Sequence, residues 1–354
     1  MEQKLKYACI GAGGIARKKH LNGYSKLPEI ELAAVCDSCR ATAEQLASDF
    51  GIRHVYTDYL EMLETERPDI VSVCTPNVTH RQITVDALEH GCNVHVEKPM
   101  ALNAEETHEI LAAAQRSGKL VQVGLNKRFL SSTVLFRRLL KQNFFGEIYH
   151  VRCGWERNSG IPGIGRWFTD HVQSGGGALI DLGVHYLDLA MYVMGWPEPM
   201  QVSGALSNNF LQEGTRIRRG YRSADGPVNV EDAANGTVIM HTGQTLEYCF
   251  SWASNIEKEI RYVEAYGTKA GFRMINDEIQ LYTQFGGTMF TLSPDMTTMP
   301  PDENEFASFV ESIQKNREPE VSAAQAAKVM ELIDLIYRDS IHWEQRMTNP
   351  RQSG

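Results

Sequence analysis

The sequence predicts an α/β protein: a doubly wound parallel sheet followed by a second α/β domain with a large, mostly antiparallel open sheet. Three observations predict this class. Strands and helices alternate regularly up to about residue 125, strands follow one another through short polar turns beyond residue 147, and the 354-residue chain is more than twice the ~150 residues typical of one domain. We therefore expect a first domain at residues 1–125 and a second at residues 126–354.

The first third of the chain contains the alternating pattern. Apolar runs bounded by turn residues predict strands at 5–10, 31–36, 55–57, 70–74, 93–96 and 120–124. Helical periodicity between these runs predicts helices at 15–27, 41–50, 59–65, 80–90 and 104–117. Alternation of this kind indicates a parallel sheet covered by helices, and such sheets bind ligands at the carboxyl ends of their strands.

A glycine-rich turn joins the first strand to the first helix. In the run GAGGIA, Gly11 permits a tight turn, Gly13 lets the backbone approach a pyrophosphate, and Ala16 lets the helix pack closely on the strand. The helix N-terminus then faces the phosphates. This succession of strand, turn and helix predicts a dinucleotide-binding site.

An acidic residue ends the second predicted strand. Asp37 follows the glycines by about 20 residues, the spacing typical of dinucleotide-binding sheets. Its carboxylate can accept hydrogen bonds from an adenosine ribose diol and would repel a 2′-phosphate, which favours NAD over NADP. Ser38 and Arg40 could contact a 2′-phosphate if Asp37 turned away, so NADP stays the less favoured alternative.

The second part of the chain is rich in strands. We expect them at 147–157, 201–205, 233–240, 245–251, 260–265, 271–275 and 278–282, with closing helices at 303–315 and 323–340. Consecutive strands joined by short turns favour antiparallel pairing.

One apolar helix in this part carries a polar stripe. It follows three consecutive glycines at 175–177, and at ~100° per residue its polar side chains fall within about 60° of one another: Asp181, His185, Asp188 and Tyr192. Such a stripe must be paired inside the protein or face a wet pocket, because an unpaired buried charge is costly. A purely structural His–Asp pair stays open; a metal site is disfavoured, because no clear third ligand accompanies the pair.

Composition and charge indicate a cytoplasmic protein without a nucleic-acid or membrane partner. The formal net charge of −9 disfavours nucleic acid and anionic lipid, and no apolar run approaches the ~18 residues of a membrane span. Seven cysteines in a long chain indicate reduced thiols. Cys36 and Cys39 form a CxxC pair, which we interpret as buried thiols rather than as a redox couple.

Four motifs, in this order along the chain, resemble the Gfo/Idh/MocA oxidoreductases, the family named for glucose–fructose oxidoreductase and inositol dehydrogenase. They are GAGGIA at 11–16, EKP at 97–99, VGLNKRF at 123–129 and GGGALIDLGVHYLD at 175–188. The resemblance implies a Rossmann domain joined to a substrate-binding α/β domain whose open sheet forms subunit contacts. It also implies NAD(P) as cofactor, a carbohydrate or cyclitol as substrate and a homo-oligomer, a dimer or a tetramer.

The resemblance, together with the patterns above, assigns roles to individual residues. The catalytic residues it implies are Lys98, Asp181 and His185. The residues expected to contact the cofactor are Gly11, Gly13, Gly14, Ile15, Asp37, Ser38, Arg40, Thr75, Asn77, His80, Glu97, Lys98 and Asn126. The residues expected to contact the substrate are Arg128, Arg166, Trp167, Asp170 and His185.

The expected chemistry is the oxidation of a secondary alcohol. His185 would take the hydroxyl proton, Lys98 would stabilise the alkoxide, and Asp181 would orient the substrate or the histidine, while hydride leaves for the nicotinamide. Similar members that contain WFT favour a pyranoside oxidised at its third ring carbon. The alternatives are an inositol dehydrogenase or keto-sugar reductase, an NAD-dependent glycosidase acting by oxidation and elimination, and a non-catalytic NAD sensor.

Overall fold

The computed structural model describes residues 4–211, 213–219 and 223–340, which form two compact units. The first unit contains the chain up to Leu125 together with Asn304–Ala327, and the second contains Asn126–Glu303 and the chain from Lys328. The segment 304–327, which we expected in the second domain, therefore belongs to the first unit. Residues 341–354 of that expected domain lie outside the described part of the chain.

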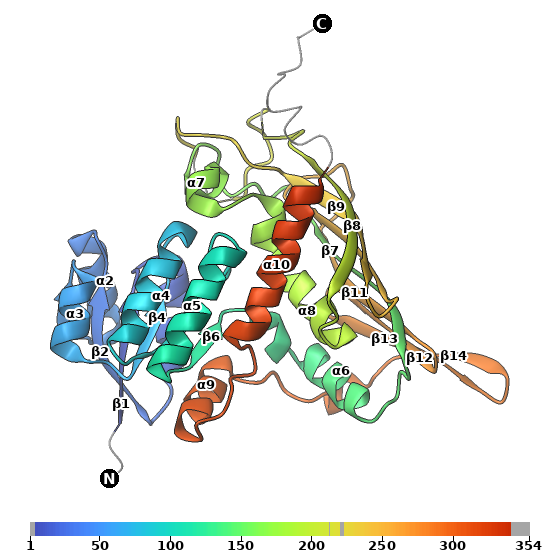
Figure 1. Cartoon of the computed structure of the whole chain (residues 1–354), viewed down its shortest axis with the longest axis horizontal. Helices are drawn as coiled ribbons and strands as arrows, with labels where there is room; N and C mark the ends of the chain where they lie inside the picture. Colours follow the sequence, from blue (N-terminus) through green and yellow to red (C-terminus); the bar gives the residue numbers. More distant parts are fainter. Residues whose placement is uncertain (1–3, 212, 220–222, 341–354) are drawn as a thin grey trace, which may run out of the picture. The chain divides into compact units, whose positions relative to one another are not determined.

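The first unit contains a six-stranded sheet in the order β3-β2-β1-β4-β5-β6 (Figure 1). All neighbouring strands are parallel, which confirms the predicted doubly wound sheet. Its strands are β1 (Leu5–Ile10), β2 (Ile30–Cys36), β3 (His54–Tyr56), β4 (Ile70–Val73), β5 (Asn93–Val96) and β6 (Val121–Val123). The helices are α2 (Arg40–Phe50), α3 (Tyr59–Glu66), η2 (Asn77–Thr79), α4 (His80–Glu89), α5 (Ala104–Ser117) and α9 (Glu305–Gln314), and α10 (Ala323–Asp339) begins here.

The helix after the glycine run differs from the prediction. Instead of one α-helix over 15–27, the chain forms a π-helix, η1 (Ala16–Leu21), followed by one α-helical turn, α1 (Asn22–Tyr24). From this wider turn the consecutive side chains of Lys19 and His20 both reach the carboxylate of Glu97. Single π turns within helices are frequent at functional sites.

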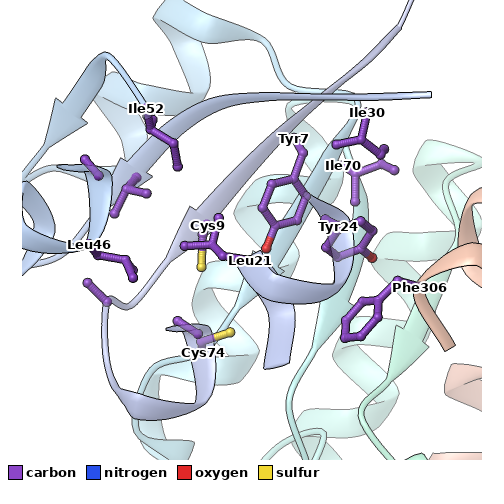
Figure 2. Close-up of a cluster of buried hydrophobic side chains, with 14 of the residues drawn as sticks. Tyr7, Cys9, Leu21, Tyr24, Ile30, Leu46, Ile52, Ile70, Cys74 and Phe306 are labelled. Atoms are coloured by element: carbon purple, nitrogen blue, oxygen red, sulfur yellow. The ribbon is translucent and has the colours of Figure 1, made fainter. Parts of the chain in front are cut away.

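Aromatic side chains from distant parts of the sequence meet in the core of the first unit (Figure 2). The ring centroids of Tyr7 and Tyr24 lie 4.3 Å apart, and those of Tyr24 and Phe306 lie 4.9 Å apart. A Cβ added to Gly23 would lie 2.2 Å from the Phe306 ring, so a glycine is needed where α1 meets α9. This packing explains why the segment 304–327 belongs to the first unit.

The second unit contains an eight-stranded sheet in the order β14-β13-β12-β11-β7-β10-β9-β8 (Figure 1). Strands β7 and β10 are parallel and the other neighbouring pairs are antiparallel, which confirms the predicted mostly antiparallel sheet. The strands are β7 (Ile148–Glu156), β8 (Pro199–Ser207), β9 (Ala233–Met240), β10 (Thr245–Ser251), β11 (Ile260–Gly267), β12 (Ala270–Ile275), β13 (Glu278–Phe285) and β14 (Thr288–Leu292).

The second unit also contains helices, most of which we did not predict. They are η3 (Asn126–Phe129), α6 (Ser131–Lys141), η4 (Trp167–Thr169), α7 (His171–Ser174), η5 (Leu179–Gly183), α8 (Val184–Met194) and η6 (Met296–Thr298). Sequence patterns did not indicate the strand β14 or the helices η3, α6, η4, α7 and η6. Helix α8 packs on β7 and β11. The stretch His171–Met194 is long and apolar enough to cross a membrane, but 83% of its most apolar window is buried within the chain, as in a core helix.

Candidate active site

In the glycine-rich turn at the end of β1, no side chains cover the backbone. Gly11 has a φ of +92°, and an added Cβ would lie 2.6 Å from the carbonyl oxygen of Cys74, so a side chain does not fit. An added Cβ on Gly13 or Gly14 would meet nothing within 4 Å, and Ile15 is 42% exposed. Exposed N–H groups at the start of a helix bind phosphate, so this turn fits the pyrophosphate of NAD.

Asp37 stands at the end of β2 and is tied to the same turn. Its Oδ2 accepts a hydrogen bond from the N–H of Ala12 and its Oδ1 accepts one from the N–H of Cys39, both at 2.8 Å. Arg40 donates to Glu44 at 2.8 Å along α2. This pairing directs the guanidinium along the helix, so the arrangement favours a ribose diol over a 2′-phosphate.

Lys98 follows the end of β5 and is half-buried. The carboxylate of the preceding Glu97 accepts hydrogen bonds from His20 Nε2 (2.9 Å), Lys19 Nζ (3.2 Å) and the Lys98 N–H (3.3 Å). Burial alone would raise the pKa of Glu97, but the Lys19 charge and the His20 hydrogen bond hold that pKa well below its usual range. Glu305 pairs with the same Lys19 at 3.2 Å. These compensated buried charges fix the backbone at Lys98.

His80 holds the Lys98 loop from another element. Its Nδ1 lies 2.7 Å from the carbonyl oxygen of Pro99, and its Nε2 lies 2.9 Å from that of Thr75. Burial lowers the pKa of His80. Glu97 and His80 thus make hydrogen bonds inside the first unit, and their contact with the cofactor stays a prediction. Thr75 and Asn77 follow β4, at the carboxyl end of the sheet where ligands are expected.

The predicted polar stripe on the apolar helix divides into two parts. Asp181 and His185 are half-buried, whereas Asp188 is completely buried. Asp181 lies in the π-helix η5, and its Oδ2 accepts a hydrogen bond from Trp252 Nε1 at 2.9 Å. The ring centroid of His185 lies 6.1 Å from that of Trp155 on β7. Partly accessible polar groups on an otherwise buried helix are candidates for ligand contact.

Arg128 pairs with Asp188, the buried residue of the stripe. Its Nε donates to Asp188 Oδ2 at 2.8 Å and its Nη2 donates to Oδ1 at 2.5 Å, and neither side chain is exposed. The rings of Tyr192 and Trp196 lie over the guanidinium, each with its centroid 4.9 Å from Cζ. Arg128 therefore joins η3 to α8 inside the second unit. Its expected contact with the substrate stays a prediction.

The other expected substrate residues lie just before the glycine run. Asp170 is buried and caps α7, accepting hydrogen bonds from the Val172 N–H at 3.2 Å and from Gln173 Nε2 at 2.8 Å. Its carboxylate therefore caps this short helix, and its contact with the substrate stays a prediction. Trp167 stacks on the next aromatic ring with centroids 3.7 Å apart, and Arg166 is exposed. Arg166 and Trp167 stay candidates for substrate contact.

Sequence reasoning missed Trp155, which lies near His185, and Lys127, which lies near Trp155. Trp155 contacts the His185 ring, and its Nε1 donates to Glu259 at 2.7 Å. The ammonium of Lys127 lies 6.0 Å from the centroid of the Trp155 ring, and burial lowers the pKa of this lysine. Lys127 stands inside the VGLNKRF run and could have been singled out there. Trp155 lies on a strand that carries no motif.

The candidate residues divide between the two units. Asn126, expected to contact the cofactor, is the first residue of the second unit, while the other expected cofactor residues lie in the first. Within residues 4–211, 213–219 and 223–340, no three His, Cys, Asp or Glu side chains are grouped so that they could hold a metal ion.

Comparison with known proteins yields the following similarities. Residues 5–125 match the Gfo/Idh/MocA family model described as "Oxidoreductase family, NAD-binding Rossmann fold". Residues 134–273 match the model of the Gfo/Idh/MocA C-terminal domain. D-glucoside 3-dehydrogenase from Escherichia coli (strain K12) is 35% identical over 343 residues, which cover 95% of each chain. scyllo-Inositol 2-dehydrogenase (NAD(+)) from Bacillus subtilis (strain 168) is 30% identical over 216 residues, 60% of this chain and 61% of that one. The solved structure of levoglucosan dehydrogenase in complex with NADH has the same fold, with a TM-score of 0.85 at 20% identity, covering 96% of this chain and 98% of that one.

Proposed function

Because the chain belongs to the Gfo/Idh/MocA oxidoreductase family, we propose that it oxidises a pyranoside at the third ring carbon. The oxidoreductase class and the NAD cofactor follow from the family, and the pyranoside and the ring position are the proposal. The observation that carries it is the similarity, along nearly the whole chain, to a D-glucoside 3-dehydrogenase. The partial exposure of Asp181 and His185 on an apolar helix supports a role for both at the substrate.

Each candidate residue has one role in the proposed reaction. Bound NAD supplies the hydride acceptor. His185 takes the proton of the hydroxyl that is oxidised, because the ordinary pKa of histidine, ~6.5, lies near neutral pH. Lys98 stabilises the negative charge that develops on the same oxygen. Asp181, held by the Trp252 indole, orients His185 or the substrate hydroxyl.

A panel of sugars tests the substrate proposal. The purified protein is mixed with NAD and with methyl β-glucoside, glucose, glucose 6-phosphate or an inositol, and the absorbance of reduced nicotinamide is followed. We expect the highest kcat/KM with the glucoside, and NMR of the product should show a ketone at the third carbon. A preference for inositol would indicate a cyclitol dehydrogenase, and release of aglycone without net NADH would indicate a glycosidase. Absence of reduced nicotinamide with every compound would contradict the proposal.

We also propose that the protein is a homo-oligomer that associates through the sheet of its second unit. The hairpin of β13 and β14 extends from the sheet (Figure 1), and Phe285 and Met289 on it are 59% and 68% exposed. A hollow of about 490 Å³ on the sheet is lined in part by Tyr149, Tyr266 and Tyr282, and no candidate site residue lines it. Exposed apolar surface of this kind is typical of protein interfaces. Sedimentation velocity should give a dimer or a tetramer, and a monomer would contradict the proposal.

A cytoplasmic location is the remaining part of the proposal. All seven cysteines are thiols, which suits a reducing compartment. Cys36 is buried, but Cys39 is exposed, which corrects the expectation that both thiols of the CxxC pair are buried. Immunoblotting of separated cell fractions tests the location.

A further inference from the structure

The glycine run before α8 packs against a buried carboxyl group that no step of the proposed chemistry uses. An added Cβ on Gly177 would lie 1.8 Å from the carbonyl oxygen of Glu231, and one on Gly176 would lie 2.0 Å from Tyr337 Oη. Side chains at these positions would push both partners away. The glycines therefore let Glu231 and Tyr337 reach the start of the helix that carries the candidate catalytic residues.

The Glu231 carboxylate binds the first turn of that helix. It accepts hydrogen bonds from the N–H groups of Gly177 and Leu179, each at 2.9 Å, and Tyr337 Oη donates to it at 3.0 Å. The N–H groups at a helix start have no partners within the helix, so this carboxylate satisfies two of them. Glu231 is only 1% exposed, and burial raises its pKa to about 7. A polar group so deeply buried is tolerated because it is hydrogen-bonded.

The next residue connects to the other side of Asp181. The carbonyl oxygen of Asp232 accepts a hydrogen bond from the Trp252 N–H at 2.8 Å, and the Trp252 indole donates to Asp181 Oδ2 at 2.9 Å. The Asp181 N–H also donates to the Gly177 carbonyl oxygen at 3.0 Å. Residues 231 and 232 thus fix Asp181 twice, through the backbone of its own turn and through its carboxylate.

We propose that Glu231 is a positioning residue for the reaction: by anchoring the first turn of the helix, it holds Asp181 and His185 in place against the substrate. The inference rests on the proposed function, because it assumes that these two side chains meet the substrate. A displacement of about 1 Å in a catalytic group can lower a rate on the order of 100-fold. Loss of the anchor therefore lowers kcat. The affinity for NAD stays the same, because the glycine turn that fits its pyrophosphate belongs to the first unit.

Three variants of the full chain test the proposal. Glu231→Ala removes the anchor, Glu231→Gln keeps one acceptor oxygen, and Tyr337→Phe removes a single hydrogen bond. For each we measure kcat, KM, the NAD dissociation constant and the primary isotope effect with a substrate deuterated at the oxidised carbon. We expect Glu231→Ala to lower kcat ~10- to 100-fold and to raise the isotope effect, because hydride transfer becomes rate-limiting. Glu231→Gln should recover part of the loss, and Tyr337→Phe should lower kcat by roughly 2- to 5-fold.

A helix cap elsewhere in the chain provides the matched control. Asp58 caps α3 in the first unit, accepting a hydrogen bond from the Leu60 N–H at 2.8 Å. Asp58→Ala should lower the melting temperature and leave kcat and the isotope effect unchanged. If Glu231→Ala behaves in the same way, the proposal is overturned.

Two further results keep the test decisive. Should Glu231→Ala fail to fold, wild-type kcat in both Glu231→Gln and Tyr337→Phe overturns the proposal. His185→Asn, assayed in the same series, separates this inference from the proposed function. Wild-type turnover in His185→Asn contradicts the proposed function, whereas its loss together with normal turnover in the Glu231 variants contradicts only the positioning role.

Discussion

Removal of the Asp188 carboxylate should destabilise the second unit, because this carboxylate pairs with the buried Arg128 guanidinium. The pair makes two hydrogen bonds, at 2.8 and 2.5 Å, and neither side chain is exposed. Removing one partner of a buried ion pair costs about 3–5 kcal/mol. In the variant the rings of Tyr192 and Trp196 still lie over the guanidinium, and a cation–π contact with a desolvated cation can offset up to ~2 kcal/mol of this cost. We therefore expect Asp188→Ala to lower the free energy of unfolding by about 3 kcal/mol, near the lower end of that range.

Urea-induced unfolding of single and double variants measures this loss. The second single variant is Arg128→Met, and the double variant combines it with Asp188→Leu so that an apolar pair of similar volume replaces the charges. Replacing both partners of a buried pair is often neutral, so the double variant should be more stable than Asp188→Ala. A loss below about 1 kcal/mol in Asp188→Ala, the value of an exposed pair, would show that this buried pair does not stabilise the second unit.

Three further predictions concern the cofactor, the substrate and pH. Asp37→Ala should lower the ratio of kcat/KM for NAD to that for NADP by ~10- to 100-fold, because it removes a charged acceptor for the ribose diol; an unchanged ratio would exclude Asp37 from selectivity. Lys127→Met should raise KM for the sugar about 10-fold, since its ammonium lies by the Trp155 ring and has no ion-pair partner among the described residues; the exposed Lys141→Met serves as control, and equal KM values would contradict the role. The folded-state pKa of Glu231, about 7, lies above the ordinary 4.5, so the folded protein binds an additional proton between these values. The free energy of unfolding should therefore fall by up to about 3 kcal/mol as pH rises from about 4.5 to about 7; Glu231→Gln should lack this slope in urea titrations, and parallel wild-type and variant curves would show that Glu231 does not titrate there.

Features that depend on neighbouring residues could be predicted from the sequence. The turn at Gly11 needs a positive φ and close packing on Cys74, and both requirements appear as a glycine between an apolar strand and a helix. The parallel sheet followed from the alternation of strands and helices, and the polar stripe on the apolar helix followed from helical spacing.

Features that depend on distant partners could not be predicted. Arg128 stands in a motif, but its partner lies 60 positions along the chain, so only the fold shows that the pair is internal. The hydrogen bond between Asp181 and Trp252 and the ion pair between Lys19 and Glu305 also join residues that are far apart in the sequence. The π turns at Ala16–Leu21 and Leu179–Gly183 were not predicted, because hydrophobic periodicity over a few residues does not distinguish a π turn from an α turn.

In the proposed reaction, Lys98 and His185 act on one alcohol during hydride transfer to NAD. The most direct measurement compares turnover and NAD affinity in wild-type protein and in Lys98→Met, with NAD binding followed by fluorescence titration and turnover by the absorbance of reduced nicotinamide. We expect a nearly unchanged NAD dissociation constant and a kcat lowered on the order of 100-fold or more. Full turnover in Lys98→Met would contradict this proposal.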